Sequence, residues 1–148
     1  MATKKHKETN EQEFQGRVTD WLNDEIKRCH RSHLDQATIE KPDATSGKRH
    51  DVVVWEDRAI TKAILTVELK TPKTLISDPT FFNDALDKAQ RRKAPLFCIW
   101  NMQRAEIYPT PVMGGAPTAC IREFDSSVPI TKVEDWLTPT GGVALEEM

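Results

Sequence analysis

The stretch DVVVWEDRAITKAILTVELK, residues 51–70, decides the fold prediction. Three consecutive valines and a tryptophan follow Asp51, and a continuous apolar run bounded by charges is typical of a strand buried on both faces. After a charged turn at Glu56–Arg58, the β-branched and aliphatic run Ile60–Lys70 predicts a second strand. Two such strands joined by a short turn most simply form a hairpin.

Upstream of this hairpin, the sequence predicts a helix and a short strand. Apolar residues recur at helical spacing from Asn10 to about Arg31, and Asn10 followed by Glu13 resembles an N-terminal capping box. Ala37–Lys41 predicts a short strand that ends before a proline. Residues 1–9 carry three lysines without apolar periodicity, so we expect a mobile basic arm there.

Downstream of the hairpin, a second helix and a second hairpin are expected. Ser77 or Asp78 before a proline is a helix start signal, and the predicted helix runs over about 80–93 with an apolar face of Phe82, Leu86 and Ala89. The runs Leu96–Trp100 and Ala105–Tyr108 predict two paired strands. Taken together, these elements predict an α/β fold with a mixed central sheet flanked by helices.

Length and composition limit the organisation of the chain. A chain of 148 residues, 38% hydrophobic and 30% charged, is of single-domain size and of soluble globular composition. We expect one domain over residues 10–137, with a short helix at Lys132–Leu137. Residues 138–148 are expected to form a linker, which suggests a fragment of a longer chain with a further domain.

The same composition bears on location and partners. No apolar run approaches the length of a membrane span, the start of the chain lacks a secretory signal, and three scattered cysteines fit a reducing compartment, so a cytoplasmic location is expected. The net charge of −2 gives no general reason to expect nucleic-acid binding. A DNA-binding prediction must therefore rest on local clusters.

Glu68, Lys70 and Asp51 form a constellation suited to chemistry. Side chains alternate along a strand, so Glu68 and Lys70 project from one face, and Asp51 in the neighbouring strand can lie beside them. Two carboxylates supply hard oxygen ligands for Mg²⁺, which Mn²⁺ can replace. A nearby lysine can orient a water and stabilise charge in a transition state.

The motifs GKRHDVVVW and VELK resemble the PD-(D/E)XK nuclease superfamily, and within it the nuclease domains of type I restriction motor subunits. The resemblance covers Asn10 to about Tyr108 and implies a restriction-endonuclease-like fold. It also implies that Asp51 and Glu68 are catalytic metal ligands and that Lys70 is the catalytic lysine. The literal Pro-Asp dipeptide ends at Asp43, which remains a reserve candidate because it precedes a turn rather than a strand.

Several residues at the edge of this constellation are further candidates. Family members often place a first-helix glutamate near the metal, and the helical wheel favours Glu11 over Glu13 for that position. Many recombination-type members carry a Gln-x-x-x-Tyr motif on the second helix; the chain lacks this pair, and Gln90 is a substitute candidate for contacting DNA. Phosphate contacts are expected from Lys48, Arg49 and His50, and with weaker support from Arg91, Arg92 and Lys93.

These features together predict a magnesium-dependent DNA endonuclease, most simply a restriction or phage-defence nuclease domain. A structure-specific repair or recombination nuclease is a second possibility. A third is a nuclease fold without activity that serves as a DNA-binding or assembly module. Because a double-strand cut needs two active sites or two sequential nicks, a homo-oligomer or a larger restriction assembly is expected, without a membrane partner.

Overall fold

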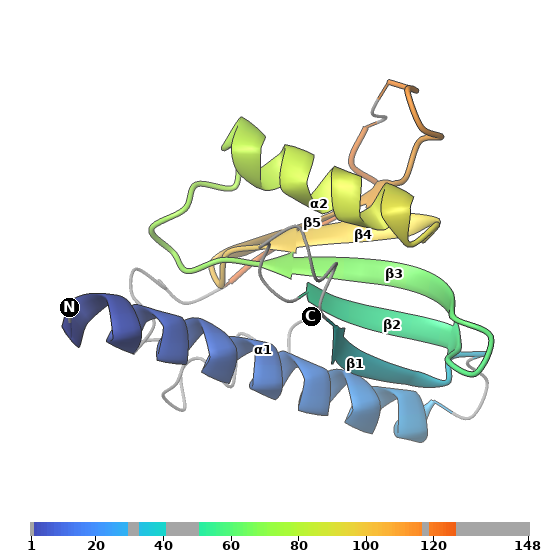
Figure 1. Ribbon diagram of the computed structural model, residues 1–148, viewed down its shortest axis with the longest axis horizontal. Helices are drawn as coiled ribbons and strands as arrows, with labels where there is room; N and C mark the ends of the chain where they lie inside the picture. Colours follow the sequence, from blue (N-terminus) through green and yellow to red (C-terminus); the bar gives the residue numbers. More distant parts are fainter. Residues whose placement is uncertain (1, 30–32, 41–50, 117–118, 127–148) are drawn as a thin grey trace.

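The computed structural model describes residues 2–29, 33–40, 51–116 and 119–126, with side chains described from residue 12 onward. Within this part of the chain, six strands form one sheet in the order of the sequence, and two helices accompany it (Figure 1). Neighbouring strands are antiparallel except β3 and β4, which are parallel. The expected mixed α/β fold is confirmed. The elements are α1 (Ala2–Arg28), β1 (Gln36–Glu40), β2 (Asp51–Asp57), β3 (Lys62–Leu69), α2 (Pro79–Arg91), β4 (Leu96–Trp100), β5 (Arg104–Pro109) and β6 (Arg122–Asp125).

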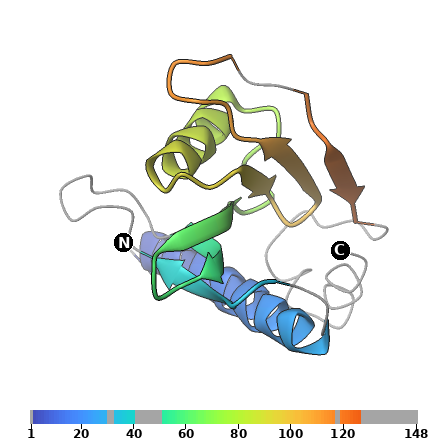
Figure 2. The same ribbon diagram turned by 90° about the vertical axis from the view of Figure 1, so that its right-hand side faces the viewer.

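The two helices cover opposite faces of the sheet (Figure 2). Alternation along the strands separates the side chains into an α1 face and an α2 face. On the α1 face, Phe14 and Val18 of the helix belong to one core cluster with Val52 and Val67. The second core cluster, on the α2 face, consists of Phe81, Ala85, Ala89, Phe97 and Ile99.

Strand β2 is buried on both faces, as the apolar run predicted. Val52 belongs to the cluster of the α1 face, whereas Val53 packs with Trp55 in a smaller cluster on the opposite face. The pairing of Val52 with Val67 and of Val54 with Leu65 confirms the expected first hairpin. The second hairpin, β4 with β5, is also confirmed.

Helix α2 begins where the sequence signal placed it. Asp78 is the N-cap, with an extended backbone and a carboxylate that accepts a hydrogen bond from the Thr80 backbone N–H at 2.9 Å. The packed face differs from the prediction, because Phe82 and Leu86 are only partly buried. Of the predicted face, Ala89 is buried, and the other buried residues of the helix are Phe81, Ala85 and Lys88.

The N-terminal boundary of α1 was predicted wrongly. The helix begins at Ala2, so residues 2–9 continue it instead of forming a separate arm, and Asn10 is not an N-cap. Lysine and glutamate are good helix formers, and this segment contains neither proline nor glycine. Helix propensity therefore extends the element beyond the range in which apolar periodicity is visible.

One further difference lies near the end of the described part of the chain. Strand β6 pairs antiparallel with β5 but was not predicted, because a four-residue strand with three exposed residues has no apolar alternation to reveal it. The helix expected at Lys132–Leu137 and the linker expected at 138–148 lie outside the described residues. No helix in the described part of the chain is long and apolar enough to cross a membrane.

Candidate active site

Asp51 and Glu68 lie opposite each other on neighbouring strands. Val52 pairs with Val67, so the next step of the antiparallel register sets Asp51, the first residue of β2, against Glu68 near the end of β3. Both side chains project to the α2 face, and their exposed fractions are only 1% and 5%. The structure thus brings together the two carboxylates that the sequence singled out.

Lys70 lies on the same face directly after β3. Its backbone N–H donates to the Trp100 carbonyl at 2.9 Å, which continues the parallel pairing of β3 and β4 past Leu69. Alternation then turns the partly buried Lys70 side chain toward the α2 face with Glu68. The three predicted catalytic residues therefore share one face at one end of the sheet.

Two cations, one from α2 and one from its C-cap, reach these carboxylates. The ammonium Nζ of Lys88 donates to Glu68 Oε2 at 2.7 Å. The guanidinium of Arg92 donates to both oxygens of Asp51, from Nε to Oδ2 at 3.2 Å and from Nη2 to Oδ1 at 3.3 Å. Lys88 and Arg92 are four residues apart and so lie on one side of the helix, one turn apart. We call Asp51, Glu68, Lys70, Lys88 and Arg92 the inner cluster.

The roles of these two cations were not predicted. The sequence predicts Arg92 only as a phosphate contact and predicts no role for Lys88. A signal for Lys88 is nevertheless present in the sequence, because Phe81, Ala85 and Lys88 follow the spacing of one helix face. A lysine within an apolar stripe is almost never fully buried unless it is paired, so this position indicates a buried carboxylate opposite.

Burial dominates the electrostatics of Glu68. It raises the pKa of the Glu68 carboxyl above its ordinary value, because water no longer solvates the charged form. The Lys88 ammonium, through charge and hydrogen bond, and the Lys70 charge lower this pKa in part, whereas the Asp51 carboxylate raises it. Glu68 is therefore electrostatically linked to three members of the inner cluster.

The donor set of the inner cluster fits Mg²⁺. No group of three or more His, Cys, Asp or Glu residues in the described ranges is placed to hold a metal, so the described residues would offer an ion the two carboxylates of Asp51 and Glu68. Mg²⁺ commonly binds one or two carboxylates, completed by waters and substrate phosphate. Thr66, two residues before Glu68, has a buried hydroxyl oxygen without a partner in the described structure, which leaves a group for such a water to contact.

Of the remaining predicted site residues, Gln90 has its side chain in the described part of the structure. The Gln90 amide donates to the backbone carbonyls of Pro111 and Val112 at 3.3 and 3.4 Å, so its contacts are with the segment after β5. Glu11 lies in α1, and its side chain is outside the described part of the structure. The phosphate-contact candidates Lys48, Arg49 and His50 and the reserve candidate Asp43 also lie outside the described residues.

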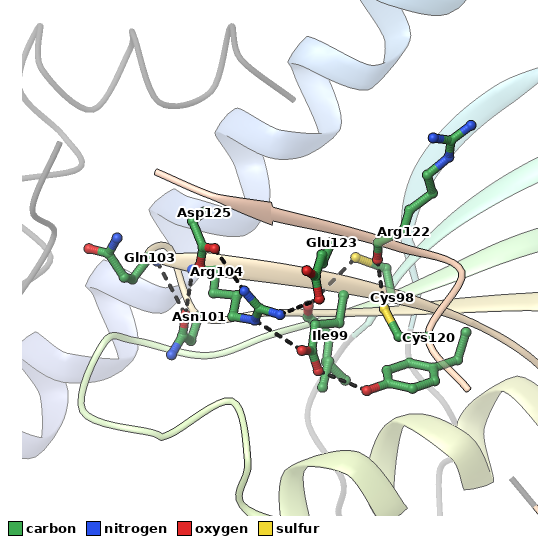
Figure 3. Close-up of polar contacts among 11 residues, drawn as sticks. Cys98, Ile99, Asn101, Gln103, Arg104, Cys120, Arg122, Glu123 and Asp125 are labelled. Carbon is green, nitrogen blue, oxygen red and sulfur yellow. Dashed lines mark hydrogen bonds and ion pairs between the residues drawn. The ribbon is translucent and has the colours of Figure 1, made fainter. Parts of the chain in front are cut away.

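A second group of charges lies on the far strands of the sheet (Figure 3). The guanidinium of Arg104 donates to Glu106 at 2.9 Å, to Asp125 at 2.8 Å and to Glu123 at 2.5 Å. The hydrogen bonds to Asp125 and then to Glu106 raise the pKa of Arg104 above its already high ordinary value. We call Arg104, Glu106, Glu123 and Asp125 the outer cluster.

Comparisons of the chain with models of known protein families, with curated protein sequences and with solved structures give no match. The order of elements and the inner cluster therefore carry the functional argument.

Proposed function

We propose that the chain is a magnesium-dependent phosphodiesterase that cleaves DNA. The observation that supports this most strongly is the placement of Asp51 and Glu68 opposite each other on β2 and β3, with Lys70 following on the same face. The order of a leading helix, an Asp-bearing strand, a Glu-x-Lys strand, a second helix and a strand pair agrees with the PD-(D/E)XK resemblance. Restriction of foreign DNA is the biology that this resemblance suggests.

Each residue has a distinct task in this proposal. Asp51 and Glu68 hold the ion, which when bound polarises the scissile phosphate and neutralises charge on the leaving oxygen. Lys70 orients the attacking water and stabilises the negative charge that develops on the phosphate. Lys88 holds the Glu68 carboxylate in position through its 2.7 Å hydrogen bond.

The charge balance of the inner cluster supports an anionic substrate. Two carboxylates, Asp51 and Glu68, face three cationic side chains from Lys70, Lys88 and Arg92, which leaves one excess positive charge before any metal binds. A phosphate diester carries one negative charge and is attracted to such a site. The chain as a whole is slightly acidic, so this attraction is local to the cluster.

The test is cleavage of plasmid and branched DNA with Mg²⁺ or Mn²⁺ by the full chain and by Lys70→Ala. We expect the wild type to cut and Lys70→Ala to lose about 10²–10³-fold in rate, the usual loss when one transition-state donor is removed. Asp51→Ala should be comparably inactive. The matched control is Lys62→Ala, because Lys62 is an exposed lysine at the opposite end of β3 that pairs with Glu56. Equal rates for all four proteins would exclude the proposed catalytic residues.

One observation favours a second candidate function, a nuclease fold without activity that binds DNA or serves in assembly. Lys88 and Arg92 already neutralise the two carboxylates, as in a structural ion-pair network. The same assay distinguishes the two functions. A wild type that binds DNA with Mg²⁺ but cuts neither substrate would favour the binding module. Cleavage of branched DNA alone would favour a repair or recombination nuclease over a restriction enzyme.

A further inference from the structure

Arg92 covers the oxygens of Asp51 that a metal ion would need. Its Nε and Nη2 atoms donate to Oδ2 and Oδ1 at 3.2 and 3.3 Å, so both oxygens of this carboxylate are engaged. Lys88 donates to Glu68 at Oε2. Binding of a divalent cation at Asp51 therefore competes directly with Arg92, whereas Glu68 can keep its hydrogen bond to Lys88.

Arg92 is also the easier of the two cations to displace. Its side chain is 18% exposed against 4% for Lys88, and its hydrogen bonds are longer than the roughly 2.7–2.9 Å typical of charged pairs. Arg92 is the C-cap residue, immediately after the last residue of α2, so its side chain can turn away without any change in the packed face of the helix. Lys88 lies within the packed face and lacks this freedom.

We propose that Arg92 is a displaceable counter-ion of Asp51 that exchanges a carboxylate for a phosphate when metal and DNA bind. This inference rests on the proposed nuclease function and adds a positioning residue to it. Without metal, Arg92 neutralises the buried Asp51. With metal bound, the guanidinium leaves Asp51 and binds the DNA backbone beside the site, since its planar fork of N–H donors fits phosphate as well as carboxylate.

Opposite effects on two ligands distinguish this role from a structural salt bridge. A competing counter-ion lowers the affinity for metal and raises the affinity for DNA, so its removal should tighten metal binding and weaken DNA binding. A purely structural Arg92 would instead keep Asp51 in place for the ion. Its removal would then leave metal binding unchanged or weaker.

The decisive measurement is calorimetric titration of Mn²⁺ into the full chain without DNA, for wild type and Arg92→Gln. Glutamine keeps much of the side-chain volume but removes the charge, so the buried Asp51, without the competing guanidinium, should bind Mn²⁺ at least about tenfold more tightly. Arg91→Gln is the matched control, because Arg91 is the exposed neighbour that pairs with Asp87 at 3.0 Å, and it should not change the affinity. An unchanged or weaker affinity in folded Arg92→Gln would overturn the proposal.

Two further variants keep the outcome interpretable. Arg92→Lys retains the charge but offers one point contact instead of a fork, so it should bind Mn²⁺ with an affinity between those of wild type and Arg92→Gln. If Arg92→Gln does not fold, an Mn²⁺ affinity of Arg92→Lys equal to that of wild type would overturn the proposal. Asp51→Asn combined with Arg92→Gln should lose the tight Mn²⁺ binding, which assigns it to Asp51.

The DNA measurement is fluorescence anisotropy with Mg²⁺ in the Lys70→Ala background, where cleavage is suppressed. Arg92→Gln should weaken DNA binding by about fivefold or more, the affinity that one charge-assisted hydrogen bond to phosphate contributes. Unchanged DNA binding would overturn the proposal that Arg92 exchanges Asp51 for phosphate. If the wild type and Asp51→Asn both fail to bind Mn²⁺, the proposed function fails and the inference with it. If the wild type binds Mn²⁺ and Arg92→Gln binds it no tighter, only the exchange fails.

Discussion

The inner and outer clusters lie on the same face of one sheet and differ chiefly in their access to water. In the inner cluster, both carboxylates are at most 5% exposed, and α2 supplies their partners. In the outer cluster, the Glu123 and Asp125 side chains are 62% and 63% exposed, and all partners come from β5 and β6. Cover by a helix, more than residue type, separates a candidate active site from a surface ion-pair network.

The strand register makes this comparison direct. Glu68 pairs with Ile99, Ile99 with Glu106, and Glu106 with Glu123, so one glutamate of the inner cluster and two of the outer cluster stand in one row across the sheet. The aromatic ring of Tyr108, which follows Glu106 on the same face, stacks on Phe97 beneath α2. The row therefore passes from the buried zone under α2 to the exposed edge at β6.

The largest effect on stability is expected from Lys88→Met. This change leaves the buried Glu68 carboxylate without its 2.7 Å partner and should lower the free energy of unfolding by about 3–5 kcal/mol, as for other broken buried ion pairs. Urea unfolding followed by tryptophan fluorescence measures it. Adding Glu68→Leu to Lys88→Met removes the unpaired charge and should restore most of the stability. A loss below about 1 kcal/mol for Lys88→Met would mean that the inner pair behaves like an exposed one.

A smaller effect is expected from Arg104→Met in the outer cluster. Two of its three ion pairs have an exposed carboxylate, that of Glu123 or Asp125, and exposed pairs contribute at most about 1 kcal/mol each. The third carboxylate, Glu106, is only partly buried. Arg104→Met should therefore destabilise the chain less than Lys88→Met does, and the loss should change with added salt because water and ions screen these charges. The same urea experiment at low and high salt checks this. A salt-independent loss as large as that of Lys88→Met would contradict the distinction between the clusters.

The sequence was sufficient to predict the centre of the fold and much of the inner cluster. An uninterrupted valine run and the aliphatic run before Glu68 specify two buried strands, and alternation then places Glu68 and Lys70 on one face. The turn between the runs fixes the pairing that brings Asp51 opposite Glu68. These signals come from residues close together in the sequence, so they can be interpreted without knowledge of the tertiary contacts.

The partners of the carboxylates could not be predicted in the same way. Arg92 lies 41 positions from Asp51 in the sequence, and only the packing of α2 on the sheet brings the two together. Strand β6 depends on its pairing with β5, a tertiary contact that leaves little trace in a short polar segment. The rotation of α2 by one position, which buries Phe81 instead of Phe82, likewise follows from packing rather than from periodicity alone.

The smallest predicted effect concerns Tyr108, which lies between the part of the sheet buried under α2 and the exposed edge at β6. Burial raises the pKa of the Tyr108 phenol above its ordinary value of about 10, and its hydrogen bond to Glu106 Oε1 at 2.8 Å raises it further. Tyr108 is the only tyrosine of the chain, so absorbance near 295 nm reports it alone. The folded protein should titrate well above pH 10, and Glu106→Gln should titrate at a lower pH than wild type, because the neighbouring negative charge is gone.

The same shift in pKa determines how the free energy of unfolding changes with pH. Because the folded phenol holds its proton more tightly than the unfolded one, its contribution to stability is complete below about pH 10 and is lost as pH rises toward the folded pKa. Tyr108→Phe should reduce this alkaline loss in urea unfolding at pH 9 and above while leaving the ring contacts with Phe82 and Phe97 intact. If the wild-type phenol instead titrated near pH 10, water would reach it. The buried part of the sheet under α2 would then end before Tyr108, nearer to the inner cluster.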